Sequence, residues 1–144
     1  MIIEGIVEQG KHLGRRLGFP TANIRPDRVE GDWPPNGVYV AALWLAGEDR
    51  AWLCMLNQGL HPTAPEGKPT VEAHVLNFAG DIYGSAVRVE YLRFLRPEHH
   101  FPDLDSLIAQ LNQDRVAVHQ WLAAARAGAD TTPEARRARA LQWH

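Results

Sequence analysis

Short apolar runs, each bounded by glycine or proline, make up the first two thirds of this 144-residue chain. Several are rich in β-branched and aromatic side chains, which indicates strands rather than helices. Because no helical segment separates them, they predict an antiparallel barrel or sandwich, since a parallel sheet needs crossover helices. The expected strands are residues 2–7, 37–45, 51–56, 70–78 and 85–95, and the expected long loops are residues 9–20, 25–36 and 59–69.

The pattern changes to helical spacing after Pro102, where apolar residues recur three or four positions apart. This spacing predicts a helix over residues 104–126, with Asp103 as its N-cap. Thr132 followed by Pro133 then predicts the start of a second, short helix. The expected organisation is one domain over residues 1–126, with a barrel at about 1–101 and the helix at 104–126, and an Arg-rich, helical tail over 127–144.

Charge and composition exclude several classes of protein. A formal net charge of −2 leaves no basic footprint for nucleic acid. No apolar run approaches the ~20 residues of a membrane-spanning helix, and the first residues lack the features of a signal peptide. The single cysteine, Cys54, lies in an apolar run, which predicts a buried thiol and no internal disulfide. We therefore expect a soluble, cytoplasmic domain that binds neither nucleic acid nor membranes.

A glycine-rich loop precedes the segment Pro-Thr-Ala-Asn. Gly10, Gly14 and Gly18 fall within nine residues, and such a loop can expose backbone N–H groups that bind an anion, although a turn between strands is the commoner explanation of such a loop. Thr21 and Asn23 stand two positions apart, so in an extended segment they face the same side. A hydroxyl and an amide oxygen are hard ligands that suit Mg²⁺; they could also be turn-capping groups.

One carboxylate lies inside a predicted strand. Glu72 is flanked by Val71 and Ala73, and carboxylates are depleted in strands. It could be a general base that activates a hydroxyl nucleophile, or a solvated residue on the outer face. His74 shares its strand face and could lie in the same pocket, although a packed or surface histidine is the commoner case.

A third group of residues stands where the barrel would meet the helix. Arg96, Glu98 and Phe101 combine a donor, an acceptor and an aromatic ring, and junctions of this kind often form ligand clefts. This set would fit a flat heterocycle, although Phe101 could instead only anchor the helix to the barrel.

Taken together, these segments resemble the riboflavin kinase family, whose kinase module also occurs as the C-terminal domain of bifunctional bacterial FAD synthetases. The resemblance runs from about residue 3 to about residue 126. It implies a six-stranded antiparallel Greek-key barrel with a C-terminal helix, and transfer of the γ-phosphoryl group of ATP to the 5′-hydroxyl of riboflavin, giving FMN and ADP. The matching segments are residues 14–23 (GRRLGFPTAN), 57–63 (NQGLHPT), 71–74 (VEAH), 81–84 (DIYG), 95–101 (LRPEHHF) and the helix up to Asp114.

The resemblance also implies roles for individual residues. Glu72 would be the general base, and Thr21 and Asn23 would bind Mg²⁺ or another divalent cation such as Zn²⁺ or Mn²⁺, with ATP as co-substrate. The implied ATP-binding residues are Gly10, Lys11, Gly14, Arg15, Gly18, Pro20, Thr21, Asn23 and Tyr83, and the implied flavin-binding residues are Arg96, Glu98, Phe101, Leu104 and Leu107.

The expected partners are riboflavin or FMN and ATP or ADP, bound by a monomer. Many bacterial relatives carry an FAD-synthesising domain before this block. Met1 stands directly before the first expected strand, so we expect that domain to be absent and the product to be FMN. An alternative is a catalytically inactive flavin-binding barrel, but the presence of Thr21, Asn23 and Glu72 together argues against it.

Overall fold

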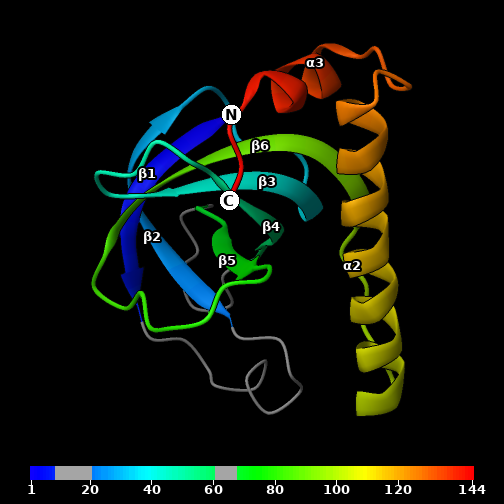
Figure 1. Cartoon of the computed structure of the whole chain (residues 1–144). Coiled ribbons are helices and arrows are strands. Elements are labelled where there is room, and N and C mark those ends of the chain that lie inside the picture. The colour runs from blue at the N-terminus through cyan, green and yellow to red at the C-terminus, as the bar shows by residue number, and fades with distance from the viewer. Residues whose placement is uncertain (9–20, 61–67) are drawn as a thin grey trace.

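Six strands form a closed barrel in the computed structural model, which describes residues 1–8, 21–60 and 68–144 (Figure 1). They are β1 (Ile2–Glu8), β2 (Ala22–Glu30), β3 (Gly37–Leu45), β4 (Trp52–Gly59), β5 (Thr70–Val75) and β6 (Ala86–Pro97). Around the barrel they follow the order β1-β2-β5-β4-β3-β6, and every neighbouring pair is antiparallel. Because β2 pairs with β5 while β3, β4 and β5 are consecutive neighbours, the predicted Greek-key barrel is confirmed.

Inward-facing side chains from all six strands fill the barrel, since alternate residues of a strand face the same side. Ile3 and Leu43 are fully buried there. The rings of Tyr39 and Tyr91 pack with their centroids 4.9 Å apart. Cys54 lies in the same core, and burial raises the pKa of its thiol, as expected for an unreactive cysteine. The interior is therefore a packed core, so a ligand has to bind outside it or at its ends.

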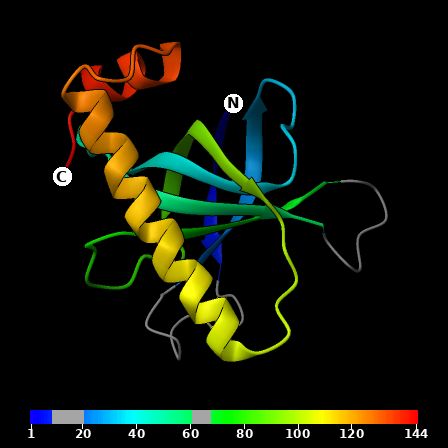
Figure 2. The same cartoon turned by 90° about the vertical axis from the view of Figure 1, so that its right-hand side faces the viewer.

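A 23-residue helix, α2 (Leu104–Arg126), lies against the outside of the barrel (Figures 1 and 2). Val118, near its middle, is fully buried in a cluster with Val38, Val40 and Met55. The apolar stripe of α2 therefore covers the outer face of β3 and β4. Of the helices in the described part of the chain, none is long and apolar enough to cross a membrane.

The ends of α2 match the sequence prediction. The carboxylate of Asp103 accepts a hydrogen bond from the Ser106 backbone N–H at 2.7 Å, which caps the helix and holds the pKa of Asp103 below its usual value. Gly128 follows the helix with φ +78°, a left-handed conformation that glycine adopts without strain. The helix predicted over residues 104–126 is therefore confirmed.

The tail packs against the barrel and α2. Its helix, α3 (Pro133–Ala140), places Arg137 against Glu90 of β6, with two hydrogen bonds at 2.8 and 3.0 Å. Beyond α3, Trp143 forms a parallel bridge with Ala51. Small buried side chains of α2 and α3 join a cluster that covers the outer face of β3 near this end. The tail therefore fixes the C-terminal half of α2 to the barrel.

The long loop expected over residues 25–36 is wrong in its first half. Residues 25–30 are not loop but the second half of β2. Pro26 suggested a break, but β5 pairs only with residues 22–24 of β2, so the missing N–H of Pro26 has no partner strand on that side. The β1–β2 register also shifts at this point. A proline at such an edge interrupts no ladder, and the strand continues.

Candidate functional site

Five residues from five strands form one row across the outside of the barrel. Asn23 of β2 pairs with Glu72 of β5, Glu72 with Asn57 of β4, Asn57 with Val38 of β3, and Val38 with Arg96 of β6. In β2, β4 and β5 the adjacent residues belong to the barrel core, so these side chains face outward. Val38 and Arg96 face α2. We call these five residues the outer row.

A cavity of about 150 Å³ lies between the outer row and α2, and we call it the helix-side cavity. Four of the five predicted flavin residues, Arg96, Glu98, Phe101 and Leu107, line it. Leu104 does not, and 54% of its surface is exposed. The other lining residues are Val38, Met55, Asn57 and His74 from the strands, His99 from the β6–α2 junction, and Leu111 and Asp114 from α2.

A buried ion pair holds one wall of this cavity. Arg96 donates from Nε to Asp114 Oδ1 at 2.9 Å and from Nη2 to Oδ2 at 2.7 Å. Gln110 adds a third bond to Oδ1 at 2.9 Å, and Arg96 Nη1 donates to the Pro97 carbonyl at 3.1 Å. The guanidinium also lies 5.8 Å from the centre of the Phe101 ring. The pair ties the end of β6 to α2, while a direct contact of Arg96 with a flavin stays a prediction.

Sequence reasoning gave no role to two residues of this site, Asp114 and Asn57. Asp114 interrupts the apolar stripe formed by Leu107, Leu111 and Val118, and it is only 4% exposed. A carboxylate on the buried face of a helix needs a charged partner, and that was a usable signal. Asn57 offered only an amide next to an apolar run, and its importance depends on the strand register.

Glu72 stands between two amide side chains in the outer row. Asn23 flanks it on β2 and Asn57 on β4, and it is half-buried rather than fully solvated. His74, two residues further along the same strand, faces the same side, is 9% exposed and lines the helix-side cavity. Glu72 thus lies beside Asn57 on the neighbouring strand and two residues from His74, both of which line the cavity.

A second cavity, of about 310 Å³, opens at one end of the barrel, and we call it the end cavity. Thr21 and Tyr83, two of the predicted ATP-binding residues, both line it. Between them, Asp81 shapes the loop by accepting a hydrogen bond from the Tyr83 backbone N–H at 2.9 Å. The remaining predicted ATP-binding residues apart from Asn23 lie outside the described residues: Gly10, Lys11, Gly14, Arg15, Gly18 and Pro20.

The oxygen atoms around Asn23 suit a hard cation. Asn23 has a carboxylate neighbour on each side in the register, Glu8 on β1 and Glu72 on β5. Glu8 also pairs with Arg25 at 2.9 Å. Over residues 1–8, 21–60 and 68–144, no cluster of three or more His, Cys, Asp or Glu could hold a metal ion. The hydroxyl of Thr21 and the amide oxygen of Asn23 still fit Mg²⁺, which takes oxygen ligands and completes its shell with water and phosphate.

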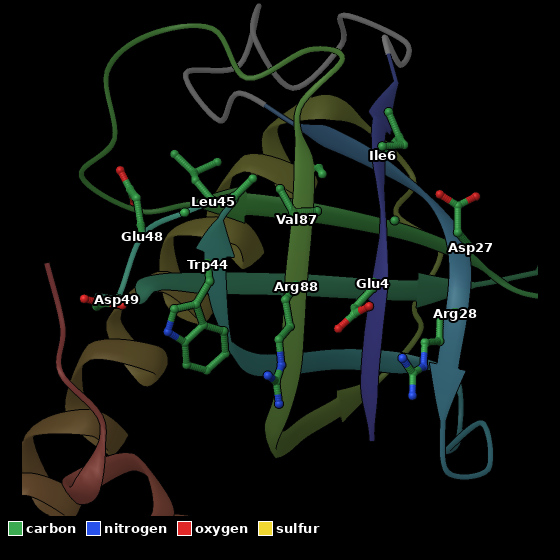
Figure 3. A pocket seen from close by; sticks show the side chains of 14 residues that line it. Glu4, Ile6, Asp27, Arg28, Trp44, Leu45, Glu48, Asp49, Val87 and Arg88 are labelled. Carbon is green, nitrogen blue, oxygen red and sulfur yellow. The ribbon is translucent and has the colours of Figure 1, made fainter.

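A hollow larger than both cavities, about 600 Å³, lies elsewhere, over β1 and β6 (Figure 3). Across neighbouring strands, Glu4 stands between Arg28 and Arg88, and Arg88 stands next to Trp44. These alternating charges offset one another. The hollow shares no lining residue with the helix-side cavity or the end cavity. Size alone therefore does not identify the site.

Two of the solved structures with a similar fold come from different organisms. A riboflavin kinase from Trypanosoma brucei aligns with a TM-score of 0.59 and 26% identity, over 84% of this chain and 78% of that one. A crystal structure described as a macrolide-efflux protein from Streptococcus pneumoniae aligns with a TM-score of 0.73 and 29% identity, over 83% of this chain and 38% of that one. The second likeness supports the fold, and no efflux function is carried over from it.

Curated relatives agree on the family. The bifunctional riboflavin kinase/FMN adenylyltransferase of Pseudomonas fluorescens is 39% identical over 123 residues, which are 85% of this chain and 38% of that protein. Its namesake in Escherichia coli K12 is 34% identical over 119 residues, 83% of this chain and 37% of that protein. This chain thus spans little more than a third of their length. The family model for riboflavin kinase (flavokinase) matches residues 1–122, and the chain belongs to the riboflavin kinase family.

Proposed function

We propose that this chain transfers the γ-phosphoryl group of ATP to the 5′-hydroxyl of riboflavin, giving FMN and ADP. One observation carries the proposal: the outer row sets Glu72 between Asn23, a predicted cation ligand, and the helix-side cavity. Membership of the riboflavin kinase family supports the reaction class. The adenylyltransferase half of the relatives' name is not carried over, because this chain matches only 38% of the Pseudomonas fluorescens protein.

The flavin ring would enter the helix-side cavity, where Phe101 and Leu107 offer apolar surface. At about 150 Å³, this cavity is smaller than the ~300 Å³ at which ligand sites of drug size begin. Binding of a flavin ring would therefore require this cavity to widen by a movement of its walls. The ion pair between Arg96 and Asp114 would limit that movement and preserve the shape of the wall.

The chemistry would be carried by Glu72. Its carboxylate would orient the 5′-hydroxyl for in-line attack and accept the hydroxyl proton while the new O–P bond forms. The bond from the γ-phosphorus to its bridging oxygen breaks, and that oxygen leaves with ADP. Phosphoryl transfer passes through a loose transition state, so the protein contributes mainly by positioning the reactants and neutralising charge.

The nucleotide would occupy the end cavity, which Thr21 and Tyr83 line. Thr21 and Asn23 would hold Mg²⁺, which when bound neutralises phosphate charge. Backbone N–H groups of the predicted glycine-rich loop and the side chains of Lys11 and Arg15 would offset the rest. Expulsion of water from this end of the barrel would suppress hydrolysis, the competing reaction.

The alternative function is a flavin-binding barrel without catalysis. Chromatographic detection of FMN after mixing the protein with riboflavin, ATP and Mg²⁺ separates the two. FMN formation supports the kinase, whereas flavin binding without FMN supports the alternative. A monomeric state and a cytoplasmic location stay predictions, and gel filtration tests the first of them.

The role of Glu72 has its own test. Glu72→Gln should fold and bind flavin but form FMN at least ~100-fold more slowly, the usual effect of losing a general base. Glu4→Gln is the matched control, because Glu4 is also a half-buried strand carboxylate but lies in the shallow hollow. It should keep near-normal turnover. Near-normal turnover in Glu72→Gln would remove Glu72 from the mechanism.

A further inference from the structure

Asn57 carries an oxygen that has no partner in the described protein. Its Oδ1 is buried and accepts no hydrogen bond from any described residue, yet the side chain lines the helix-side cavity. Gln58 and Tyr91 also carry unpaired buried oxygens, but neither lines that cavity. An unpaired buried acceptor destabilises a fold. An unpaired acceptor beside a ligand cavity can be explained if the ligand supplies the missing donor.

The outer row shows which part of a ligand would reach Asn57. Neighbouring strands lie about 4.8 Å apart, so successive members of the outer row are separated by about that distance. Asn57 is the neighbour of Glu72 on one side and of Val38 on the other. If the proposed function holds, the reacting hydroxyl lies at Glu72 and the flavin ring lies over Val38. The segment between them, which spans two strand spacings or about 10 Å, is the polyol chain.

We propose that Asn57 is a specificity-determining residue, whose Oδ1 accepts a hydrogen bond from a hydroxyl of the ribityl chain. This inference rests on the proposed function. The chemistry matches, because a hydroxyl is a donor and a bare isoalloxazine ring offers none at this point of the row. The residue contacts the substrate but transfers no proton. Its effect is to favour flavins that carry a polyol chain over the ring alone.

The test compares two ligands by fluorescence titration without ATP, so that it does not depend on turnover. The ligands are riboflavin and lumiflavin, which has the ring but no polyol chain. Asn57→Leu keeps the branched shape and the number of side-chain heavy atoms, and it removes the acceptor. It should weaken riboflavin binding about 10-fold, since a site built to hydrogen-bond a hydroxyl loses specificity without that bond. Lumiflavin binding should change less than about 2-fold, because the ring does not use the acceptor.

Two further measurements separate this role from a structural one. The Tm of the free Asn57→Leu protein should stay equal or rise, because the substitution removes an unsatisfied buried acceptor. Met55→Leu is the matched control, since Met55 lines the same cavity and the change conserves volume. It should affect both ligands by the same factor.

Each remaining outcome counts against a specific claim. Equal weakening of both ligands in Asn57→Leu, no weakening of either, or a Tm lowered by several degrees would overturn the role of Asn57. In those three cases the proposed kinase function survives, because the wild-type protein still binds flavin. Failure of the wild-type protein to bind either ligand would overturn the proposed function and this inference together.

Discussion

Removal of the Asp114 carboxylate tests how strongly the cavity wall is held. Asp114→Ala breaks two hydrogen bonds from Arg96, at 2.9 and 2.7 Å, and one from Gln110, at 2.9 Å. It also leaves the Arg96 side chain, only 20% exposed, without its counter-charge. Breaking a buried pair costs about 3–5 kcal/mol. Because Arg96 keeps some contact with water, we expect the free energy of unfolding to fall by about 3 kcal/mol, the lower end of that range.

Urea denaturation followed by tryptophan fluorescence measures this loss, since the chain has five tryptophans. In a thermal melt it corresponds to a decrease in Tm of roughly 10 °C for a domain of this size. Asp105→Ala is the control, because Asp105 is an exposed carboxylate in the first turn of the same helix. Its loss should cost less than about 1 kcal/mol, the usual value of a charge near a helix end.

A double variant tests whether the stability lost in Asp114→Ala comes from leaving the charge of Arg96 unpaired. Arg96→Met/Asp114→Leu removes both charges and fills the space with apolar groups, which in buried pairs is often neutral or stabilising. We expect it to recover most of the stability that Asp114→Ala loses. The reasoning is refuted if Asp114→Ala loses less than about 1 kcal/mol, or if the double variant is no more stable than the single one.

Two other changes test the cation site and the helix cap. Asn23→Ala should raise the Mg²⁺ concentration needed for half-maximal FMN formation; an unchanged requirement would exclude Asn23 as a ligand. The hydrogen bond from Ser106 lowers the pKa of Asp103, so the cap stabilises the fold above the unfolded carboxyl pKa of about 3.9 and is lost as pH falls through the folded value. Asp103→Asn keeps a capping oxygen that does not titrate, so urea denaturation should show a smaller loss of stability below about pH 4. Parallel pH profiles of variant and wild type would contradict this.

Local signals in the sequence were enough to predict α2. Each of these signals depends on residues that are close in the sequence: Asp103 caps the start of the helix, Gly128 follows its end, and apolar residues recur at helical spacing between them. The second half of β2 was missed for the same reason, since Pro26 is a local signal for a break. Only the closed barrel reveals that no strand pairs with Pro26 on its N–H side.

The outer row could not be predicted from the sequence, because its members stand at positions 23, 38, 57, 72 and 96. A register shift of one residue in any strand would turn the side chain of that strand's outer-row residue into the barrel core. The resemblance to a family could suggest roles for Asn23, Glu72 and Arg96 one at a time. It could not show that Asn57 stands between Glu72 and Val38 and lines the cavity, since that follows from the registers of β4 with β5 and β3.

The packed interior explains why this barrel needs a helix at its site. Core side chains fill the inside, and the proposed flavin site lies on the outer face, where one wall of strands alone would leave a planar ligand exposed to water. The helix α2 supplies the second wall with Leu107 and Leu111. Two ionic contacts join the helices to β6: Arg96 with Asp114 of α2, beside the cavity, and Glu90 with Arg137 of α3. Arg137 lies beyond the matched residues 1–122, and α3 packs on the C-terminal half of α2, so the tail fixes α2 to the barrel without lining the cavity.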